Sequence, residues 1–457
     1  MRDLDVVVLA AGKGTRMNST RPKVLHELAG RPLLSHVLES VAGLAPRQTV
    51  VVVGFEAGQV RSAMAARTEL EWVEQQEQLG TGHAVEQAMH DLGQAGIVLV
   101  VYGDVPLVKP STLERAAKAA QAGKVGLITA RVSDPAELGR IVRDDKGNVC
   151  AIVEYADADA TTRALAEINS GIVSVPTHCL RQWLAGLNRD NAQGEYYLTD
   201  IIAMAVDDGI EVESIEALES EVSGVNDRAQ LAEMERTYQR EAAMALMRSG
   251  VTIADPARLD VRGQVTCGQD CFIDINVVFT GSVVLGRGVR IGAGVCITDA
   301  EIGDGTRIEP HSVVEGALIA KDCSVGPFAR VRPGSVLEDG VKVGNFVETK
   351  KARLGRGTKA SHLAYLGDAT LGAECNVGAG TVTCNYDGID KHRTEIGDDV
   401  FVGTNSTLVA PLVVEDGAFV AAGSVVTTKV ESGDLAVGRG KQRNIKGWTR
   451  PDKRDKG

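Results

Sequence analysis

The chain has 457 residues, enough for two or three domains, and its hydrophobic share of 44% is typical of a globular protein. A net charge of −12 argues against a general nucleic-acid binder, because such proteins present a basic surface. The sequence contains no apolar run of about 18 residues, the length that could span a membrane. The first residues also lack the basic segment of a signal peptide, so we expect a cytoplasmic protein.

The cysteines and histidines give no sign of a structural metal site. The eight cysteines occur without a CxxC pair, and the eight histidines form no HExxH motif. We therefore expect neither a disulfide framework nor structural zinc, and reduced thiols in the core are the simpler interpretation.

Residues 1–226 alternate between strand-like and helix-like segments. Apolar runs typical of strands buried on both faces lie at residues 6–10, 50–53, 97–101 and 125–129. Helix-like stretches between them include residues 32–44 and 84–92. This alternation predicts a Rossmann-like α/β domain with a mostly parallel sheet, whose ligands bind at the carboxyl ends of the strands.

Residues 227–249 contain neither proline nor glycine and are rich in helix-forming residues, which predicts one long helix that ends at Gly250. A helix of about 20 residues spans about 30 Å, so we interpret it as a linker between two domains. The predicted domains are therefore residues 1–226 and residues 250–457.

From about residue 265 an aliphatic residue recurs every six positions. One unbroken series is Ile319, Val325, Val331, Leu337 and Val343. This period fits a strand and a tight corner, repeated so that three faces close a coil of about 18 residues. It predicts a parallel β-helix of stacked coils. The pattern breaks at residues 348–370 and 381–395, where we expect loops that carry functional residues.

A glycine-rich turn directly follows the first strand. Residues 9–17, LAAGKGTRM, match neither the P-loop nor the GxGxxG pattern. Their backbone amides and the cations Lys13 and Arg16 nevertheless suit a phosphate ligand. A purely structural turn is the alternative interpretation.

With the segments that follow, this turn resembles the signature of the sugar-1-phosphate nucleotidylyltransferases. The matching segments are RPKVL (21–25), QLGTGHA (78–84), YGDVPL (102–107), GRIV (139–142), VEYAD (153–157), INSGI (168–172) and GVND (224–227). With the repeat half attached, the whole chain resembles the family of bifunctional N-acetylglucosamine-1-phosphate uridylyltransferases/glucosamine-1-phosphate acetyltransferases. The resemblance implies that glucosamine-1-phosphate, acetyl-CoA and UTP are converted to UDP-N-acetylglucosamine.

For the first domain the resemblance implies a magnesium-dependent uridylyl transfer. Asp104 and Asn226 would hold Mg²⁺, and Arg16 and Lys23 would be catalytic contacts to the phosphates. The implied contacts to the nucleotide and the sugar are Leu9, Ala10, Ala11, Gly12, Lys23, Gln75, Gly80, Thr81, Tyr102, Gly103, Asp104, Gly139, Glu154, Asn169 and Asn226. Taken singly, Asp104 could instead end a turn and Glu154 could be a surface charge.

N-acetylation of an amine is helped by a base with a pKa near neutrality, and histidine is the suitable side chain. The second domain holds only His311, His362 and His392. His311 lies in a regular repeat and His392 lies between charges, whereas His362 lies in a break of the pattern beside Tyr365. A structural histidine is the alternative, but the resemblance implies that His362 is the catalytic base.

The resemblance also implies the other contacts of the second domain. Those to the amino-sugar phosphate are Arg332, Lys350, Tyr365, Asn376 and Lys391. Those to acetyl-CoA are Ala379, Asn385, Tyr386, Thr404, Ala422 and Arg439. Thr404 stands where the family often has serine, which puts identical packing in doubt. Glu348 either assists His362 or is a surface charge.

The family's β-helix is left-handed and packs into a homotrimer, so the resemblance implies a homotrimer with small-molecule substrates and without nucleic-acid or membrane partners. The basic run Arg439–Lys456 is either a solvated end or a cover for a phosphate-rich ligand. Two other functions stay open. The chain could be a sugar nucleotidylyltransferase whose β-helix is only regulatory or oligomerising, or a catalytically silent scaffold or sugar-binding protein.

Overall fold

The computed structural model describes residues 3–450, and the chain divides after Tyr238 into two compact units. We call these the N-terminal unit and the C-terminal unit. The division falls inside helix α9 (Arg228–Arg248), which Gly250 follows with a φ of 101°. The domain limits of 1–226 and 250–457, with a linker helix between them, stay a prediction. Within residues 3–450, no helix is long and apolar enough to cross a membrane.

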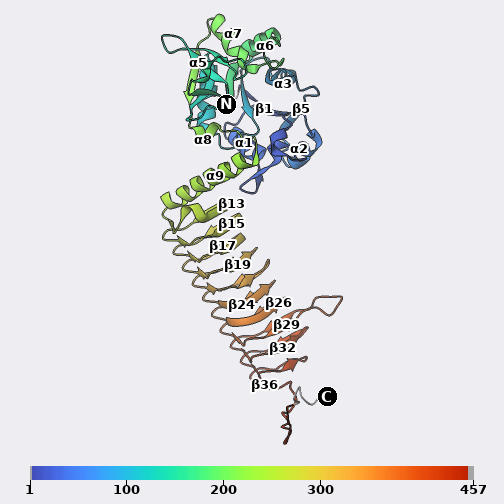
Figure 1. Ribbon diagram of the computed structural model, residues 1–457. Helices are drawn as coiled ribbons and strands as arrows, with labels where there is room; N and C mark the ends of the chain where they lie inside the picture. Colours follow the sequence, from blue (N-terminus) through green and yellow to red (C-terminus); the bar gives the residue numbers. More distant parts are fainter. Residues whose placement is uncertain (1–2, 451–457) are drawn as a thin grey trace, which may run out of the picture. The chain divides into compact units, whose positions relative to one another are not determined.

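Within the described residues, a nine-stranded sheet forms the centre of the N-terminal unit (Figure 1). Its strands are β1 (Leu4–Ala10), β4 (Gln48–Val53), β5 (Leu70–Glu74), β6 (Ile97–Tyr102), β7 (Val125–Arg131), β8 (Arg140–Arg143), β9 (Val149–Val153), β10 (Glu167–Pro176) and β11 (Val212–Glu216). Seven of them follow the order β11-β7-β10-β6-β1-β4-β5. Strand β10 is antiparallel to β6 and β7, whereas the other neighbours in this order are parallel. The prediction of a mostly parallel sheet is confirmed.

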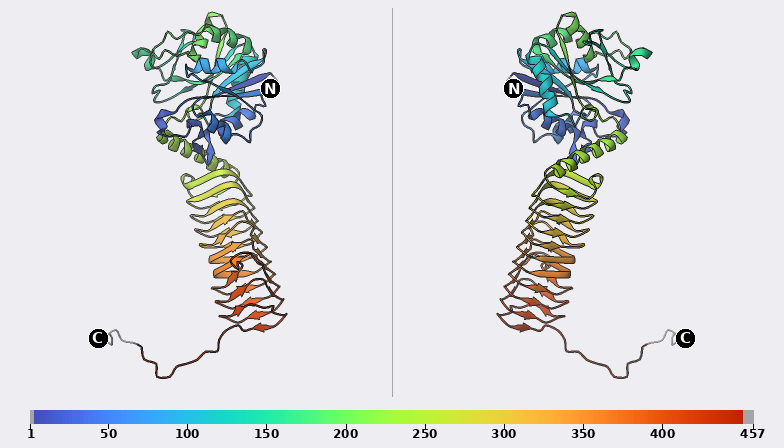
Figure 2. Two further views of the ribbon diagram at one scale, coloured as in Figure 1. Left: turned by 90° about the vertical axis from the view of Figure 1, so that its right-hand side faces the viewer. Right: turned by 90° about the vertical axis from the view of Figure 1, so that its left-hand side faces the viewer.

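Strand β1 is buried on both faces, as its unbroken apolar run predicts. Val6 and Val8 belong to the core on one face of the sheet, and Val7 and Leu9 belong to the core on the other. The helices of the first face are α1 (Leu33–Ala42), α2 (Ala57–Ala63) and α4 (Pro110–Gln121). Those of the second face are α3 (Thr81–Ala88), α6 (Thr177–Gly186) and α7 (Ile201–Asp207). Helices therefore cover both faces (Figure 2), and ligands must approach an edge where the strands end.

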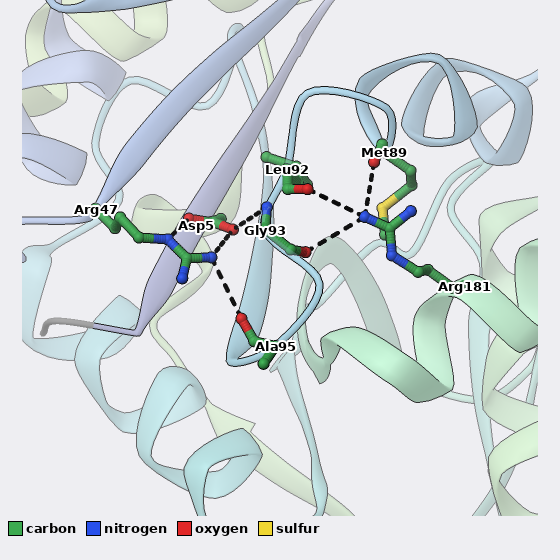
Figure 3. A network of polar contacts seen from close by, with 7 residues as sticks. All are labelled: Asp5, Arg47, Met89, Leu92, Gly93, Ala95 and Arg181. Carbon is green, nitrogen blue, oxygen red and sulfur yellow. Dashed lines mark hydrogen bonds and ion pairs between the residues drawn. The ribbon is translucent and has the colours of Figure 1, made fainter.

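Helix α3 is shorter at its carboxyl end than predicted, since it covers Thr81–Ala88 rather than residues 84–92. The chain continues as a loop whose carbonyl oxygens face a side chain (Figure 3). The Arg181 guanidinium donates to the carbonyl oxygens of Met89, Leu92 and Gly93 at 2.8, 3.1 and 3.3 Å. A distant arginine thus satisfies carbonyl groups of the segment that follows the helix, which local periodicity does not reveal.

An ion pair between Arg47 and a buried carboxylate holds the other side of this loop (Figure 3). Asp5, at the amino end of β1, is fully buried and accepts hydrogen bonds from Arg47 Nε at 2.9 Å and from the Gly93 amide at 3.2 Å. Arg47 also donates to the Ala95 carbonyl at 3.3 Å. The hydrogen bond to Asp5 raises the pKa of Arg47. These contacts tie the loop between α3 and β6 to the central strand.

Within residues 239–450, the C-terminal unit contains 25 strands, β12 to β36, stacked as parallel rungs (Figure 1). The longest are β13 (Leu259–Cys267), β15 (Val277–Leu285), β17 (Cys296–Ile302), β24 (Lys342–Lys350) and β26 (Lys359–Gly367), and the others have two or three residues. One column of inward side chains, none more than 3% exposed, is Ile273, Ile291, Ile308, Val325, Val343, Ala360, Val377, Val402 and Val420. The predicted left-handed parallel β-helix of six-residue repeats is confirmed.

The prediction of a loop at residues 348–370 is wrong. Strands β24 and β26 pair in register from Lys342↔Lys359 to Lys350↔Gly367. Val347 and Leu366 still point inward and are buried, so the coil continues while polar and aromatic residues occupy its outward positions.

The second pattern break does contain a loop. Residues 385–393, between β29 (Val382–Cys384) and β30 (Thr394–Ile396), leave the coils and protrude (Figure 1). Residues 437–450 follow the last strand, β36 (Leu435–Ala436), without further helix or strand. The end of the predicted basic run, from Lys453 on, lies outside the described residues.

Candidate active sites

The first candidate site lies where β1 and β6 end at the carboxyl edge of the sheet. The Gly103 amide donates to the Leu9 carbonyl at 2.9 Å, which holds the segment after β6 beside the glycine-rich turn. The Val225 amide donates to the Asp104 carbonyl at 3.0 Å and so brings the next residue, Asn226, to Asp104. Two distant motifs therefore meet at this edge.

A lysine lies between the two predicted metal ligands. Lys23 Nζ forms an ion pair with Asp104 Oδ2 and donates to Asn226 Oδ1 at 3.2 Å. The Lys23 and Asp104 side chains are 16% and 14% exposed. The two oxygens thus converge on a positive charge, and carboxylate and amide oxygens are the donors that Mg²⁺ prefers. The two oxygens fit a divalent metal, whose remaining ligands would have to be water and phosphate. Within residues 3–450, no group of three or more His, Cys, Asp or Glu side chains could hold a metal ion.

A cavity of about 1510 Å³ adjoins Asp104. The predicted site residues that line it are Arg16, Tyr102, Asp104, Gly139, Glu154, Asn169 and Asn226. Glu154 accepts a hydrogen bond from Thr199 Oγ1 at 3.1 Å. Burial raises the pKa of Glu154, and burial followed by the nearby Glu154 and Asp104 carboxylates raises the pKa of Tyr102. The cavity is large enough for a sugar nucleotide and carries polar groups from several elements.

The other predicted contacts of this half do not line the cavity. Leu9 and Ala10 are buried within β1, so only their backbone could meet a ligand. Gln75 is buried and donates to the Gly80 carbonyl at 3.1 Å. Gly80 has a φ of 111°, and a Cβ there would lie 2.5 Å from the Tyr196 carbonyl oxygen, so this position requires glycine. Thr81 Oγ1 accepts from the Leu198 amide at 3.1 Å.

The second candidate site lies on an outward face of β24 and β26. The register pairs Asn345 with His362 and Glu348 with Tyr365. His362 is exposed, and its Nδ1 lies 2.8 Å from Asn345 Oδ1. Because a carboxamide oxygen only accepts, Nδ1 carries the proton and Nε2 is free to accept one.

Glu348 does not contact His362 in this arrangement; it pairs with Arg332 at 2.7 Å. This pairing raises the pKa of Arg332. Lys350 and Lys391 are also adjacent. The pKa of Lys350 is lowered mainly by Lys391 and to a smaller extent by Arg332. Lys350 of β24, Lys391 of the 385–393 loop and Arg332 therefore meet near Tyr365, as an anion-binding site requires.

The remaining predicted residues occupy different parts of the coils. Asn376 pairs with Lys359 and Phe401, in a strand column other than that of Tyr365. Two backbone hydrogen bonds link the corners of consecutive coils. The Asn405 amide donates to the Ala379 carbonyl at 2.7 Å, and the Gly423 amide donates to the Thr404 carbonyl at 2.7 Å.

Arg439 donates to the Ala422 carbonyl and extends this corner column. Asn385 donates to Asp368, and the Tyr386 hydroxyl donates to the Gly388 carbonyl at 2.6 Å within the protruding loop. Of the other histidines, His311 is exposed and stacks on Phe328 at 5.1 Å, and His392 pairs with Asp387 at 2.7 Å.

Sequence reasoning missed the neighbours that hold the predicted side chains: Thr199 at Glu154, His83 at Gln75 and Asn345 at His362. Of these three neighbours, only Asn345 could have been found from the sequence. Once a coil of 17 residues is assumed, the residue next to His362 in the preceding coil is Asn345.

These features define the class of protein: a nucleotidyltransferase-type α/β unit and a hexapeptide-repeat β-helix of the acyltransferase type in one chain. Three family models match: the MobA-like NTP transferase domain over residues 6–191, the GMPPB C-terminal domain over 261–355, and the hexapeptide repeat of succinyl-transferase over 393–428.

Curated relatives match over nearly the whole length. The protein named "Bifunctional protein GlmU" in Marinobacter nauticus is 52% identical over 454 residues, which are 99% of this chain and 100% of the relative. Proteins of the same name from Alkalilimnicola ehrlichii and Pseudomonas entomophila are each 52% identical, over 99% and 98% of this chain and 97% and 99% of their own lengths. The chain belongs to the family of bifunctional GlmU proteins.

Proposed function

We propose that this chain makes UDP-N-acetylglucosamine in two reactions. The β-helix transfers the acetyl group of acetyl-CoA to the amine of glucosamine-1-phosphate. The α/β unit then transfers the uridylyl group of UTP to N-acetylglucosamine-1-phosphate in the presence of Mg²⁺ and releases pyrophosphate. The observation that carries the proposal is the presence of two separate polar centres, one around Asp104 and one around His362, each with the groups that its reaction needs.

In the acetyl transfer, His362 is the base. Asn345 holds Nδ1–H, so the lone pair of Nε2 can accept a proton from the substrate amine as the amine attacks the thioester carbonyl. The thiolate of CoA leaves. Arg332, Lys350 and Lys391 bind the sugar phosphate and keep the amine within reach of His362. Asn376 and Tyr365 complete this sugar-phosphate site.

Glu348 neutralises Arg332 rather than acting on the imidazole. Acetyl-CoA contacts Asn385 and Tyr386 of the protruding loop and the corner column, which consists of Ala379, Thr404, Ala422 and Arg439.

In the uridylyl transfer, the sugar phosphate attacks the α-phosphorus of UTP and needs no protein nucleophile. Asp104 and Asn226 would hold Mg²⁺, which when bound neutralises charge on the phosphate oxygens. Lys23 and Arg16 bind the phosphates, and Lys23 must move from Asp104 as ligands enter. Glu154, Asn169, Tyr102 and Gly139 bind the sugar in the cavity.

We propose that the β-helix assembles as a homotrimer. An exposed apolar column supports this: Phe401, Phe419 and Leu435 are in register on consecutive coils and are 39%, 44% and 62% exposed. Association would bury such a surface. Light scattering of the full chain should give three times the chain mass, and a monomer would contradict the proposal.

A single reaction mixture tests the function. Purified protein, glucosamine-1-phosphate, acetyl-CoA, UTP and Mg²⁺ should yield UDP-N-acetylglucosamine, free CoA and pyrophosphate, identified by mass. With acetyl-CoA omitted and N-acetylglucosamine-1-phosphate supplied, UDP-N-acetylglucosamine should still form. CoA release without UDP-sugar, or UDP-sugar without CoA release, would reduce the function to one of the two reactions.

A further inference from the structure

A buried carboxylate close to the first site, Glu221, takes no part in the reactions proposed above. We propose that Glu221 is a positioning residue for the metal site: it fastens the segment that carries Asn226 to the segment that carries Asp104, and so sets the distance between these two ligands. The inference rests on the proposed function, because it concerns the Mg²⁺ of the uridylyl transfer.

Both oxygens of the Glu221 carboxylate are bound. Glu221 lies in α8 (Glu219–Val222) and is 6% exposed. Its Oε2 accepts a hydrogen bond from Thr112 Oγ1 at 2.7 Å, and its Oε1 accepts one from Lys109 Nζ at 3.1 Å. Thr112 is buried in the first turn of α4, and Lys109 directly precedes that helix. The carboxylate therefore joins α8 to the beginning of α4.

The same two segments carry the metal ligands. Asp104 lies in the stretch between β6 and α4, and Asn226 lies in the stretch between α8 and α9. The Val225 amide donates to the Asp104 carbonyl at 3.0 Å, and a Cβ on Gly224 would lie 3.7 Å from Asp104 Oδ2. The two segments are thus joined at two points, one beside the ligands themselves and the other at Glu221.

The second junction matters because a small divalent cation is sensitive to the position of its ligands. Mg²⁺ requires nearly ideal octahedral geometry, so a movement of Asn226 relative to Asp104 would weaken its binding. Two hydrogen bonds to one carboxylate fix direction as well as distance, whereas an apolar contact between α8 and α4 would let the helices slide. Ser220 and Val222 of α8 line the cavity, and Glu221 holds this wall from the side of α4.

The test compares two substitutions in the full chain. Glu221→Leu is similar in size but has no acceptor, whereas Glu221→Gln keeps an oxygen that can accept from Thr112. Mn²⁺, which prefers oxygen ligands as Mg²⁺ does, would be titrated into protein saturated with UDP-N-acetylglucosamine, and electron paramagnetic resonance would measure the free ion. We expect the Kd for Mn²⁺ to rise by about tenfold or more in Glu221→Leu and to stay within about threefold of wild type in Glu221→Gln. Glu211→Leu, which removes an exposed carboxylate paired with Lys124 at 2.7 Å, is the matched control and should leave this Kd unchanged.

Steady-state kinetics of the uridylyl transfer give a second readout. The Mg²⁺ concentration for half-maximal rate should rise by about tenfold in Glu221→Leu, whereas the rate at saturating Mg²⁺ should fall by less than about threefold. A merely structural role would lower the rate to the same degree at every Mg²⁺ concentration and would leave the Mn²⁺ affinity of the folded protein unchanged. That result would overturn the inference.

The outcomes separate the two proposals. A wild-type chain that neither binds Mn²⁺ nor forms UDP-N-acetylglucosamine refutes the proposed function, and this inference with it. A wild-type chain that does both, together with an unchanged Kd in a folded Glu221→Leu variant, overturns the role of Glu221 alone. If Glu221→Leu does not fold, Thr112→Val decides, because it removes one donor to Glu221 and keeps the shape of the side chain. The Kd for Mn²⁺ should then rise by about threefold or more, and an unchanged Kd would overturn the inference.

Discussion

Lys23 and a metal ion would compete for the same two oxygens of Asp104 and Asn226. In the free protein the ammonium group supplies the positive charge that keeps the carboxylate from standing alone in a partly buried site. When phosphates and Mg²⁺ enter, Lys23 can turn to the phosphates. Lys23 would therefore serve both the free and the loaded site.

Replacing Asp104 tests this arrangement. Asp104→Ala should lower uridylyl transfer by about 100-fold or more, because it removes the one carboxylate of the metal site. Acetylation of glucosamine-1-phosphate by the same preparation should be unchanged. Asp145→Ala, at an exposed carboxylate outside the cavity, is the control. Pyrophosphate release at saturating Mg²⁺ measures the effect, and near wild-type release in Asp104→Ala would remove Asp104 from the site.

His362 and Asn345 form a second testable pair. His362→Ala should lower acetyl transfer by about 10²–10⁴-fold, the usual effect of a positioned base. Asn345→Ala should lower kcat by about tenfold with little change in KM, because the imidazole loses its orientation rather than its substrate. Asn345→Asp keeps the acceptor and adds a charge that stabilises the protonated ring, so the pH of half-maximal kcat should move upward. Equal loss in Asn345→Ala and Asn345→Asp, without a shifted pH profile, would assign Asn345 a structural role only.

The burial of Glu154 costs the protein stability. Burial raises the pKa of this carboxyl above its usual value. Stability is therefore lost as pH rises from about 4.3, the value in an unfolded chain, through the raised value in the folded chain. Glu154→Gln should raise the melting temperature of the N-terminal unit at neutral pH by about 2 °C or more, with the gain shrinking toward pH 4. Thermal unfolding across pH would measure this, and a less stable glutamine variant at pH 7.5 would contradict it.

At the scale of elements, the loop between α3 and β6 depends on a buried charge. Removing Arg47 leaves Asp5 fully buried without its ionic partner. Arg47→Ala should therefore lower the free energy of unfolding of the N-terminal unit by about 1–3 kcal/mol, because Asp5 keeps the Gly93 amide but loses its charged donor. Arg61→Ala removes an exposed pair with Glu74 at 3.5 Å and should cost about 0.5 kcal/mol or less. Urea unfolding followed by the fluorescence of Trp72 and Trp183 would compare them, and equal effects would show that Asp5 does not need Arg47.

Elements built from local contacts were predictable from sequence. In the β-helix each coil packs on its two neighbours, so the six-residue repeat carries the whole pattern. The strand at residues 97–101 was predictable because an apolar run marks a strand covered on both faces. The end of α3 was not predictable, because the segment that follows it is held by Arg181 of a distant helix.

The two candidate sites were predictable from the sequence only in part. Strand ends and motifs indicated Asp104, Asn226 and His362, but their supporting neighbours depend on register and tertiary contacts. Thr199 reaches Glu154 across 45 positions of sequence, which no local pattern records. The wrong prediction of a loop at 348–370 has a similar reason. The outward side chains change there, but the inward residues keep the strands paired, so the coil is not interrupted.

In the whole molecule, one chain carries two reactions in sequence, each with its own centre. The first centre lies in the unit that ends at Tyr238, and the second lies in the unit that begins at Gln239. N-acetylglucosamine-1-phosphate is the product of one reaction and the substrate of the other. Variants disabled at different centres should therefore complement each other in solution.

The most direct measurement mixes Asp104→Ala and His362→Ala proteins with glucosamine-1-phosphate, acetyl-CoA, UTP and Mg²⁺, and follows UDP-N-acetylglucosamine by mass. We predict that each variant alone forms little of it, that Asp104→Ala alone accumulates N-acetylglucosamine-1-phosphate, and that the mixture restores the final product. If either variant alone completed the conversion, or if the mixture failed while both proteins were folded, the account of two centres with these residues would be contradicted.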